Sequence, residues 1–307
     1  MADKVAVVTG SNKGLGFAIV KRLCEKYSGK VYLTSRDKER GMNAVKELVK
    51  LDLHPEYHQL DVTDRQSVEK FRDHIKETHG GIDILINNAG IAANFFAPSY
   101  EEDKKIIDTN FKSIFTIEEF LYPLLRENGR VLNISSDCGH LSNLRNKYWI
   151  EKFVSKNFSL TDVNDFVNWF LDSSRDGTFK REDFADWGII AAYRVAKVAL
   201  SAVTMLQQKD LEARNISINS MHPGLVRTDM TAKIGFFTSE QAAETPVHIV
   251  LDAPQSLKGA YLWYDGTVVD WFDYKSDHFF KSWSVASWFP YSWLANIFSY
   301  FSSRFGY

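Results

Sequence analysis

Tyr193 and Lys197, four residues apart, form the residue pair in this sequence best suited to proton transfer. Four residues is about one helical turn, so both side chains lie on the same face of a helix. A phenol has an ordinary pKa of about 10, too high for an acid or base working near neutrality. A nearby ammonium favours the phenolate and lowers that pKa. The pair is a candidate acid–base site, although a plain surface helix pair would have the same spacing.

A glycine-rich segment near the N-terminus, Thr9-Gly10-Ser-Asn-Lys-Gly14-Leu-Gly16, is typical of a phosphate-binding turn. Side chains at the glycine positions would keep the backbone away from a pyrophosphate. The N-terminus of the helix that follows supplies free N–H groups and a partial positive charge. We predict that a dinucleotide binds here, although a tight structural turn is the alternative. The candidate contacts are Gly10, Asn12, Lys13, Gly14, Leu15 and Gly16.

Six further positions are candidates for binding the nucleotide. Where an acidic residue would bind the ribose of NAD, Ser35 is followed by Arg36, which can pair with a 2′-phosphate. With Lys13, it favours NADP(H), although a solvated surface arginine is the alternative. Asp61 is placed to accept from an adenine amino group or, alternatively, to cap a helix, because Asp64 follows. The remaining candidates are Val62 and, in a small-residue segment that can pass close to a ribose, Asn87, Ala89 and Gly90.

These candidates follow β-branched runs that alternate with amphipathic segments. The predicted strands are 4–9, 31–35, 57–60, 82–87, 130–135, 216–221 and 259–264, and the predicted helices are 14–27, 37–51, 64–78, 101–127, 190–213 and 239–251. This alternation predicts an α/β fold with a doubly wound parallel sheet of about seven strands in the order 3-2-1-4-5-6-7. Residues 140–187, with helical stretches near 144–156 and 160–172, interrupt the pattern and are interpreted as an insertion into one domain.

Composition excludes several classes of protein. Apolar residues make up 45% of the 307 residues and charged residues 25%, as in a folded protein. Lys+Arg 37 against Asp+Glu 39 gives no basic excess, so nucleic acid is not expected as a partner. Cys24 and Cys138 form no disulfide framework, no His/Cys cluster has metal-ligand spacing, and the N-terminus lacks a signal peptide's pattern. A cytoplasmic protein without a bound metal is expected.

The motifs taken in order resemble the short-chain dehydrogenase/reductase family, and within it the animal carbonyl reductases. They are Thr9-Gly10-x-x-x-Gly14-x-Gly16, Asn87-Asn88-Ala89-Gly90, Asn110, Ser135-Ser136-x-x-Gly139, Tyr193-x-x-x-Lys197 and Pro223-Gly224-x-Val226-x-Thr228. The resemblance covers about residues 3 to 271. It implies a Rossmann-type domain, 1–271, that binds NADPH and reduces ketones, aldehydes or quinones to alcohols.

The resemblance also implies a role for each motif residue. Tyr193 is the general acid, Lys197 binds the nicotinamide ribose, and Ser136 donates a hydrogen bond to the substrate oxygen. Asn110 holds a water that relays protons. Pro223, Gly224, Val226 and Thr228 hold the carboxamide side of the cofactor. The insertion matches that of the monomeric carbonyl reductases and implies a monomer.

Two segments stand outside this scheme. Residues 172–183 resemble a calcium-binding EF-hand loop. However, ligand position 9 holds Lys180, and position 12 holds Asp183 where such loops have glutamate. A turn at Gly177 between two helices is therefore favoured. The extension 272–307 has 14 aromatic residues, against 29 in the preceding 271 residues. Its stripe of Trp293, Leu294, Ile297, Phe298 and Phe301 could pack on protein, the favoured alternative, or lie at a membrane surface. Two other functions stay open: a dinucleotide-binding scaffold recruited through this extension, and oxidation of a specific alcohol.

Overall fold

The computed structural model describes residues 3–92, 99–155, 157–185 and 190–276, and its centre is an eight-stranded sheet ordered β3-β2-β1-β4-β5-β6-β7-β8. The strands are β1 (Val5–Val8), β2 (Lys30–Ser35), β3 (Glu56–Gln59), β4 (Ile82–Asn87), β5 (Leu125–Ile134), β6 (Ser217–Met221), β7 (Tyr261–Leu262) and β8 (Val268–Val269). The first seven are parallel in the predicted order. The eighth was not predicted; it runs antiparallel to β7 because a turn at Gly266 reverses the chain.

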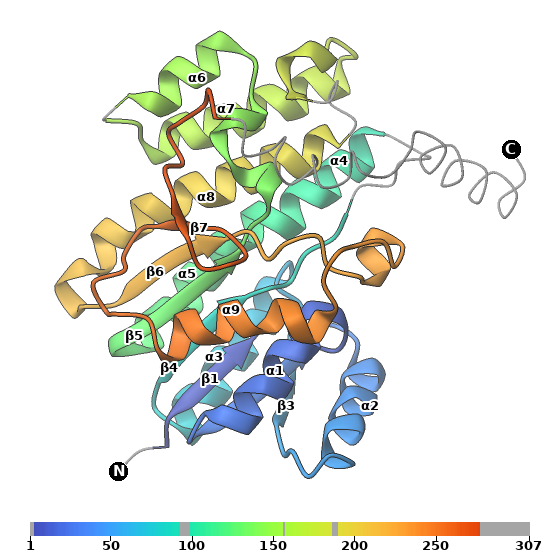
Figure 1. Cartoon of the computed structure of the whole chain (residues 1–307), viewed down its shortest axis with the longest axis vertical. Helices are drawn as coiled ribbons and strands as arrows, with labels where there is room; N and C mark the ends of the chain where they lie inside the picture. Colours follow the sequence, from blue (N-terminus) through green and yellow to red (C-terminus); the bar gives the residue numbers. More distant parts are fainter. Residues whose placement is uncertain (1–2, 93–98, 156, 186–189, 277–307) are drawn as a thin grey trace, which may run out of the picture.

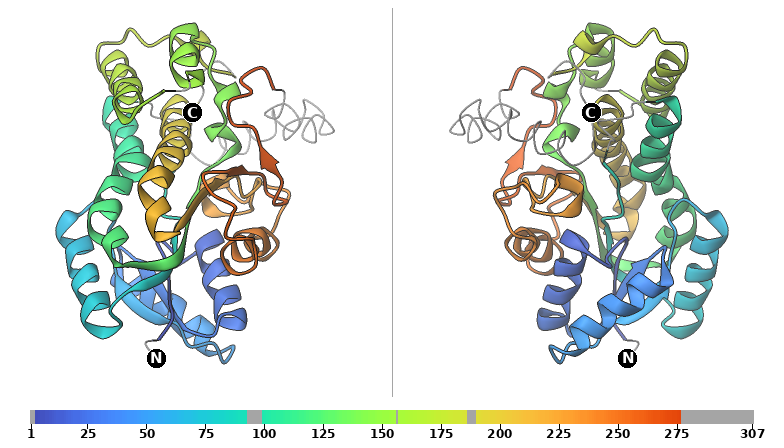
Figure 2. Two further views of the ribbon diagram at one scale, coloured as in Figure 1. Left: turned by 90° about the vertical axis from the view of Figure 1, so that its left-hand side faces the viewer. Right: turned by 90° about the vertical axis from the view of Figure 1, so that its right-hand side faces the viewer.

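Helices cover both faces of this sheet, as a doubly wound fold requires (Figures 1 and 2). One face carries α1 (Gly14–Lys26), α2 (Lys38–Val49) and α9 (Ser239–Leu251); the other carries α3 (Arg65–Thr78), α4 (Tyr100–Ile107), α5 (Ser113–Leu121) and α8 (Ala191–Leu211). In β1, Ala6 and Val8 point to the first face and Val5 and Val7 to the second. All four are fully buried, which is why this strand is a continuous apolar run.

The prediction of a single helix over 101–127 is wrong in two places. A π-helical turn, Asp108–Lys112, separates α4 from α5, and a 3₁₀ turn, Tyr122–Leu124, ends α5. Pro123 lacks the N–H that would continue the helix. Strand β5 therefore begins at Leu125, five residues before its predicted start, and pairs with β4 across a register shift between Ile82 and Ile84.

The predicted insertion contains α6 (Lys147–Val154) and α7 (Leu160–Arg175), which pack beside α8 at the top of Figure 1. Trp271 also packs there. Its ring lies edge to face against that of Phe153, and its indole N–H donates to the Gly139 carbonyl at 2.6 Å. Helix α7 continues through Arg175, so Asp172 is helical and pairs with Arg175, and Gly177 makes the turn at φ +69°. Within the described ranges, no group of three or more acidic, His or Cys side chains is arranged to hold a metal.

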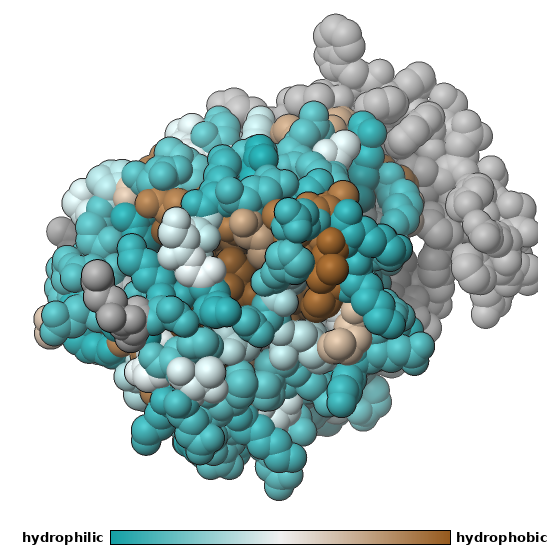
Figure 3. All heavy atoms as spheres, turned by 90° about the horizontal axis from the view of Figure 1, so that it is seen from below, coloured by the Kyte–Doolittle hydropathy of each residue, from teal (hydrophilic) through white to brown (hydrophobic). Residues whose placement is uncertain are grey.

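Seen from below, the molecule is mostly hydrophilic, with a small group of hydrophobic side chains near the centre (Figure 3). No helix in the described part of the chain is long and apolar enough to cross a bilayer. The apolar stripe predicted over 293–301 lies outside the described residues.

Candidate active site

The glycine-rich turn after β1 packs directly against the turn after β4. A Cβ at Gly10 would lie 2.8 Å from the Ala89 Cα, and one at Gly16 would lie 2.4 Å from the Asn88 Nδ2. The Thr9 hydroxyl accepts the N–H groups of Asn88 and Ala89, both at 3.0 Å. The Asn88 amide donates in return to the carbonyls of Thr9 and Gly10. Only glycine fits this contact, which fixes one wall of the predicted dinucleotide site.

The N-terminus of α1 is open for an anion. Its N-cap residue, Lys13, makes no side-chain capping hydrogen bond, so the first N–H groups of the helix have no side-chain acceptor there. Gly14 has φ +60°, and a Cβ there would lie 3.3 Å from the Thr228 Cγ2. The Lys13 ammonium pairs with Asp229 at 2.9 Å, across the same opening. These residues fit a pyrophosphate held by backbone N–H groups and one cation.

The ends of β2 and β3 hold the residues predicted to select the nucleotide. Arg36 is exposed, and its side chain has no ion pair within the described ranges. The neighbouring acid, Asp37, caps α2 by accepting the Arg40 N–H at 2.9 Å. Asp61 accepts from the N–H and hydroxyl of Thr63, and Asp64 provides the α3 cap. The helix-cap alternative for Asp61 is therefore wrong, because Asp64 takes that role.

Side-chain amides connect β4 with its neighbours. Asn87 donates to the Asn133 Oδ1 at 2.8 Å, and Asn133 donates to the Thr204 hydroxyl on α8, also at 2.8 Å. The Asn87 Oδ1 is buried without a hydrogen-bond partner. Asn87 also lines a small cavity together with Thr9, Ala89 and Asn110. An unpaired, buried acceptor therefore lies at the carboxyl end of β4.

The acid–base pair lies on α8 as its spacing predicts. The Lys197 ammonium is 5.7 Å from the centre of the Tyr193 ring and donates to the Ile134 carbonyl at 2.7 Å. Burial lowers the pKa of Lys197 to about 8. Burial also raises the pKa of Tyr193, with smaller contributions from Cys138 and Asp137, while a hydrogen bond with Ser136 opposes the rise. The lowered phenol pKa expected from Lys197 is not found, because desolvation of the buried phenol is the largest influence and raises the pKa of Tyr193.

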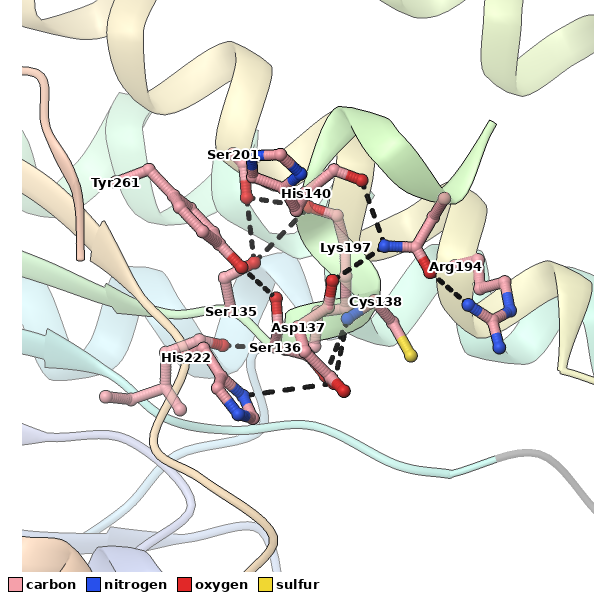
Figure 4. A network of polar contacts seen from close by, with 12 residues as sticks. Ser135, Ser136, Asp137, Cys138, His140, Arg194, Lys197, Ser201, His222 and Tyr261 are labelled. Carbon is pink, nitrogen blue, oxygen red and sulfur yellow. Dashed lines mark hydrogen bonds and ion pairs between the residues drawn. The ribbon is translucent and has the colours of Figure 1, made fainter. Parts of the chain in front are cut away.

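The adjacent serines after β5 have different environments (Figure 4). Ser135 faces α8, where its hydroxyl is 2.8 Å from that of Ser201. Gly139 permits this contact, since a Cβ there would lie 2.3 Å from the Ser135 Oγ. Ser136 instead lies near enough to Tyr193 to lower the pKa of its phenol, and the Ser136 carbonyl accepts the Tyr261 hydroxyl at 2.6 Å. The structure thus brings together the serine chosen by motif spacing and the candidate acid.

Asn110 lies in the π-helical turn between α4 and α5, a helix irregularity that is frequent at functional sites. Its amide accepts from the Ile91 N–H and donates to the Ile91 carbonyl, both at 2.8 Å. These bonds hold the chain that leaves Gly90, whose added Cβ would lie 3.3 Å from the Asn110 Oδ1. The predicted role in holding a water stays a prediction.

The segment after β6 closes the other side of the site. Gly224 has φ +84° and lies against the ring of Phe237. Val226 pairs with Phe237 in an isolated parallel bridge, and Thr228 lies against Gly14 of the phosphate-binding turn. Pro223 precedes this loop, directly after the buried His222. Of the predicted carboxamide residues, Thr228 is therefore placed directly beside the glycine turn.

The sequence interpretation missed two contributors. Asp137 accepts the Ser136 hydroxyl at 2.8 Å, and Tyr261 holds the Ser136 carbonyl from β7. An acid inside the Ser-Ser-x-x-Gly motif was a visible signal for the first. No local signal points to the second, because 125 residues separate the two partners.

Comparison with known proteins identifies the family. The sequence profile of the family described as short chain dehydrogenase matches residues 4–149 and 184–237. The chain belongs to this family. The unmatched stretch between those ranges falls inside the predicted insertion and holds most of α6 and α7.

Named relatives and solved structures agree with this assignment. "Carbonyl reductase [NADPH] 3" of Mus musculus is 38% identical over 83% of this chain and 93% of its own length. "Carbonyl reductase [NADPH] 1" of Bos taurus is 35% identical over 84% and 94%. The structure of salutaridine reductase from Papaver somniferum is similar with a TM-score of 0.78 at 29% identity, covering 85% of this chain and 99% of that one.

Proposed function

We propose that this family member is an NADPH-dependent reductase of carbonyl compounds, with ketones, aldehydes and quinones as substrates. The observation that carries the proposal is the convergence of Tyr193, Ser136 and Lys197 beside a glycine cradle at the carboxyl edge of the sheet. The relatives named as NADPH carbonyl reductases, which match most of their own lengths, support the cofactor and the reaction class.

The residues would divide the work as follows. Bound NADPH would supply a hydride from its nicotinamide C4 to the carbonyl carbon. Tyr193 would donate its phenol proton to the carbonyl oxygen, giving the alcohol, and Ser136 would stabilise the charge that develops on that oxygen. Lys197 would bind the nicotinamide ribose. To do so, the Lys197 ammonium would give up its hydrogen bond to the Ile134 carbonyl. Asn110 would hold the water that returns a proton to Tyr193.

Cofactor binding would use the residues that line the groove. The backbone of Gly10, Gly14 and Gly16 would receive the pyrophosphate and Arg36 the 2′-phosphate, because an exposed guanidinium can pair bidentately with phosphate. The remaining proposed contacts are Asn12, Lys13, Leu15, Asp61, Val62, Asn87, Ala89, Gly90, Pro223, Gly224, Val226 and Thr228. We also propose one domain, 1–271, with an extension at 272–307, acting as a cytoplasmic monomer.

The test is consumption of NADPH with an aromatic ketone or a quinone. Tyr193→Phe should lower turnover by roughly a thousandfold, within the range of general acid catalysis, and leave NADPH binding unchanged by fluorescence titration. Tyr148→Phe, a change at an exposed tyrosine on α6, is the matched control and should retain activity. A Tyr193→Phe protein with wild-type turnover would refute the assignment.

A further inference from the structure

The turn that follows β5 carries Ser136 and is held at its carbonyl groups by side chains from distant parts of the sequence. Ser136 is the N-cap of the 3₁₀ turn Asp137–Gly139, and its carbonyl accepts the Gly139 N–H at 2.8 Å. The same carbonyl accepts the Tyr261 hydroxyl at 2.6 Å (Figure 4). At the other end of the turn, the Gly139 carbonyl accepts the Trp271 indole N–H at 2.6 Å. The roles proposed above use neither aromatic residue.

The two aromatic donors belong to one hairpin at the edge of the sheet. Tyr261 lies in β7 opposite Val269 of β8, and Trp271 follows two residues after Val269. A third contact joins the hairpin to the turn, because the His140 Nε2 lies 3.0 Å from the Asp270 carbonyl. Tyr261 and Trp271 are each only 2% exposed, so solvent does not compete for their hydrogen bonds. The hairpin therefore fixes the turn through buried contacts.

Helix α8 contacts the same turn. A Cβ on Gly139 would lie 2.8 Å from the Lys197 carbonyl and 2.8 Å from the Ser201 Oγ, so the turn packs closely on the helix that carries Tyr193. Glycine has no side chain that could interlock with the helix. The hydrogen bonds from the hairpin therefore restrict how the turn can shift along α8, and with it the distance between Ser136 and Tyr193.

We propose that Tyr261 and Trp271 are positioning residues that hold the Ser136 hydroxyl where it donates to the substrate oxygen. The inference rests on the proposed function of Ser136. A donor stabilises the charge that develops on an oxygen only within hydrogen-bond reach of it, and a displacement of about 1 Å can lower turnover by about a hundredfold. Loss of either aromatic donor leaves a carbonyl of the turn with one buried partner fewer. The turn should then relax and move Ser136 from its place beside Tyr193.

The kinetic test removes each donor and keeps a buried ring. Tyr261→Phe and Trp271→Phe should each lower kcat for carbonyl reduction by about tenfold or more and leave the KM for NADPH unchanged. Tyr32→Phe is the matched control for the first, because it removes a buried tyrosine hydroxyl that also makes hydrogen bonds. Trp149→Phe, in the same apolar cluster as Trp271, is the control for the second. Both controls should retain kcat, and wild-type kcat in the two hairpin variants would overturn the proposal.

Combination with Ser136→Ala separates positioning from a general loss of structure. If Tyr261 acts through Ser136, adding Tyr261→Phe to Ser136→Ala should lower kcat by no more than about twofold further. A merely structural role would lower kcat by the same factor in both backgrounds. That result would overturn the proposal.

A measurement without substrate tests whether the hairpin holds the turn. The Gly139 N–H donates to the Ser136 carbonyl, and its exchange with solvent should be at least about tenfold faster in Tyr261→Phe and Trp271→Phe than in wild type and the two controls. Unchanged exchange would overturn the proposal even if the variants lose activity. Wild type that reduces no carbonyl compound would instead sink the proposed function and leave the exchange rates to decide whether Tyr261 and Trp271 hold the turn.

Discussion

Replacing Lys197 by methionine should separate stability from activity in this protein. The ammonium is buried, with only 5% of the residue exposed, and the Ile134 carbonyl at 2.7 Å is its hydrogen-bond partner. Burial disfavours the charged form, which is why the pKa of Lys197 falls from 10.5 to about 8. Methionine has a similar length and no charge to desolvate. The substitution therefore removes a cost of folding together with a group that the proposed reaction needs.

The size of the effect follows from the pKa change. The unfolded chain binds the Lys197 proton up to about pH 10.5 and the folded protein only up to about pH 8. Between these values the unfolded chain holds more protons, so the stability of wild type rises with pH. From pH 7 to about pH 9.5 this gain is roughly 2 kcal/mol, at about 1.4 kcal/mol per unit above pH 8. The methionine variant lacks the gain, and its loss of the Ile134 hydrogen bond is the same at every pH.

Urea unfolding of wild type and Lys197→Met across this pH range measures the difference. We expect the stability of the variant relative to wild type to fall by roughly 2 kcal/mol as pH rises from 7 to about 9.5. Carbonyl reduction should fall at least a hundredfold at neutral pH. Lys209→Met, on the exposed part of the same helix, is the control and should show no such pH dependence. A stability difference that stays constant with pH would refute the reasoning.

Two further substitutions test the cofactor groove. Arg36→Ala should raise the KM for NADPH by about tenfold or more, the effect of losing one charge-assisted hydrogen bond, and leave the KM for NADH nearly unchanged; equal changes in both would show that Arg36 does not bind the 2′-phosphate. Gly16→Ala places a Cβ 2.8 Å from the Ser11 Cα, so it should cost about 1–3 kcal/mol in urea unfolding and weaken NADPH binding. Gly80→Ala is the control: Gly80 has φ +75° but open space around it, so this change introduces backbone strain without crowding. Equal losses of NADPH binding in both variants would contradict the proposed role of the glycine turn in cofactor binding.

Much of the site was predictable because its residues lie at fixed places in a repeated pattern. In a parallel sheet the carboxyl ends of the strands meet at one edge, so Gly10, Asn87 and Ser136 had to lie near one another once the alternation was recognised. The pair Tyr193 and Lys197 needed only the helical period. The choice of Ser136 over Ser135 came from motif spacing, and the contact of Ser135 with Ser201 gives its physical reason.

Other features depend on contacts that no local pattern contains. The helix predicted over 101–127 has a continuous apolar period, and the π-helical turn at Asn110 arises where that residue bonds to Ile91, 19 positions away. The pKa of Tyr193 was expected to fall because of Lys197. It rises because burial, which depends on everything packed around α8, dominates over a single neighbour.

The sequence by itself determined the order of strands and helices, the glycine turn and the spacing of the candidate acid–base pair, because periodicity and backbone freedom are properties of neighbouring residues. Only the tertiary structure decided which groups lie around the candidate acid. Asp137, Ser136, Tyr193 and His222 come from three separate segments of the chain, and the effect of each on another's pKa depends on the distance between them and on exclusion of water. Folding alone sets those two quantities, so the protonation state of the site is a property of the fold.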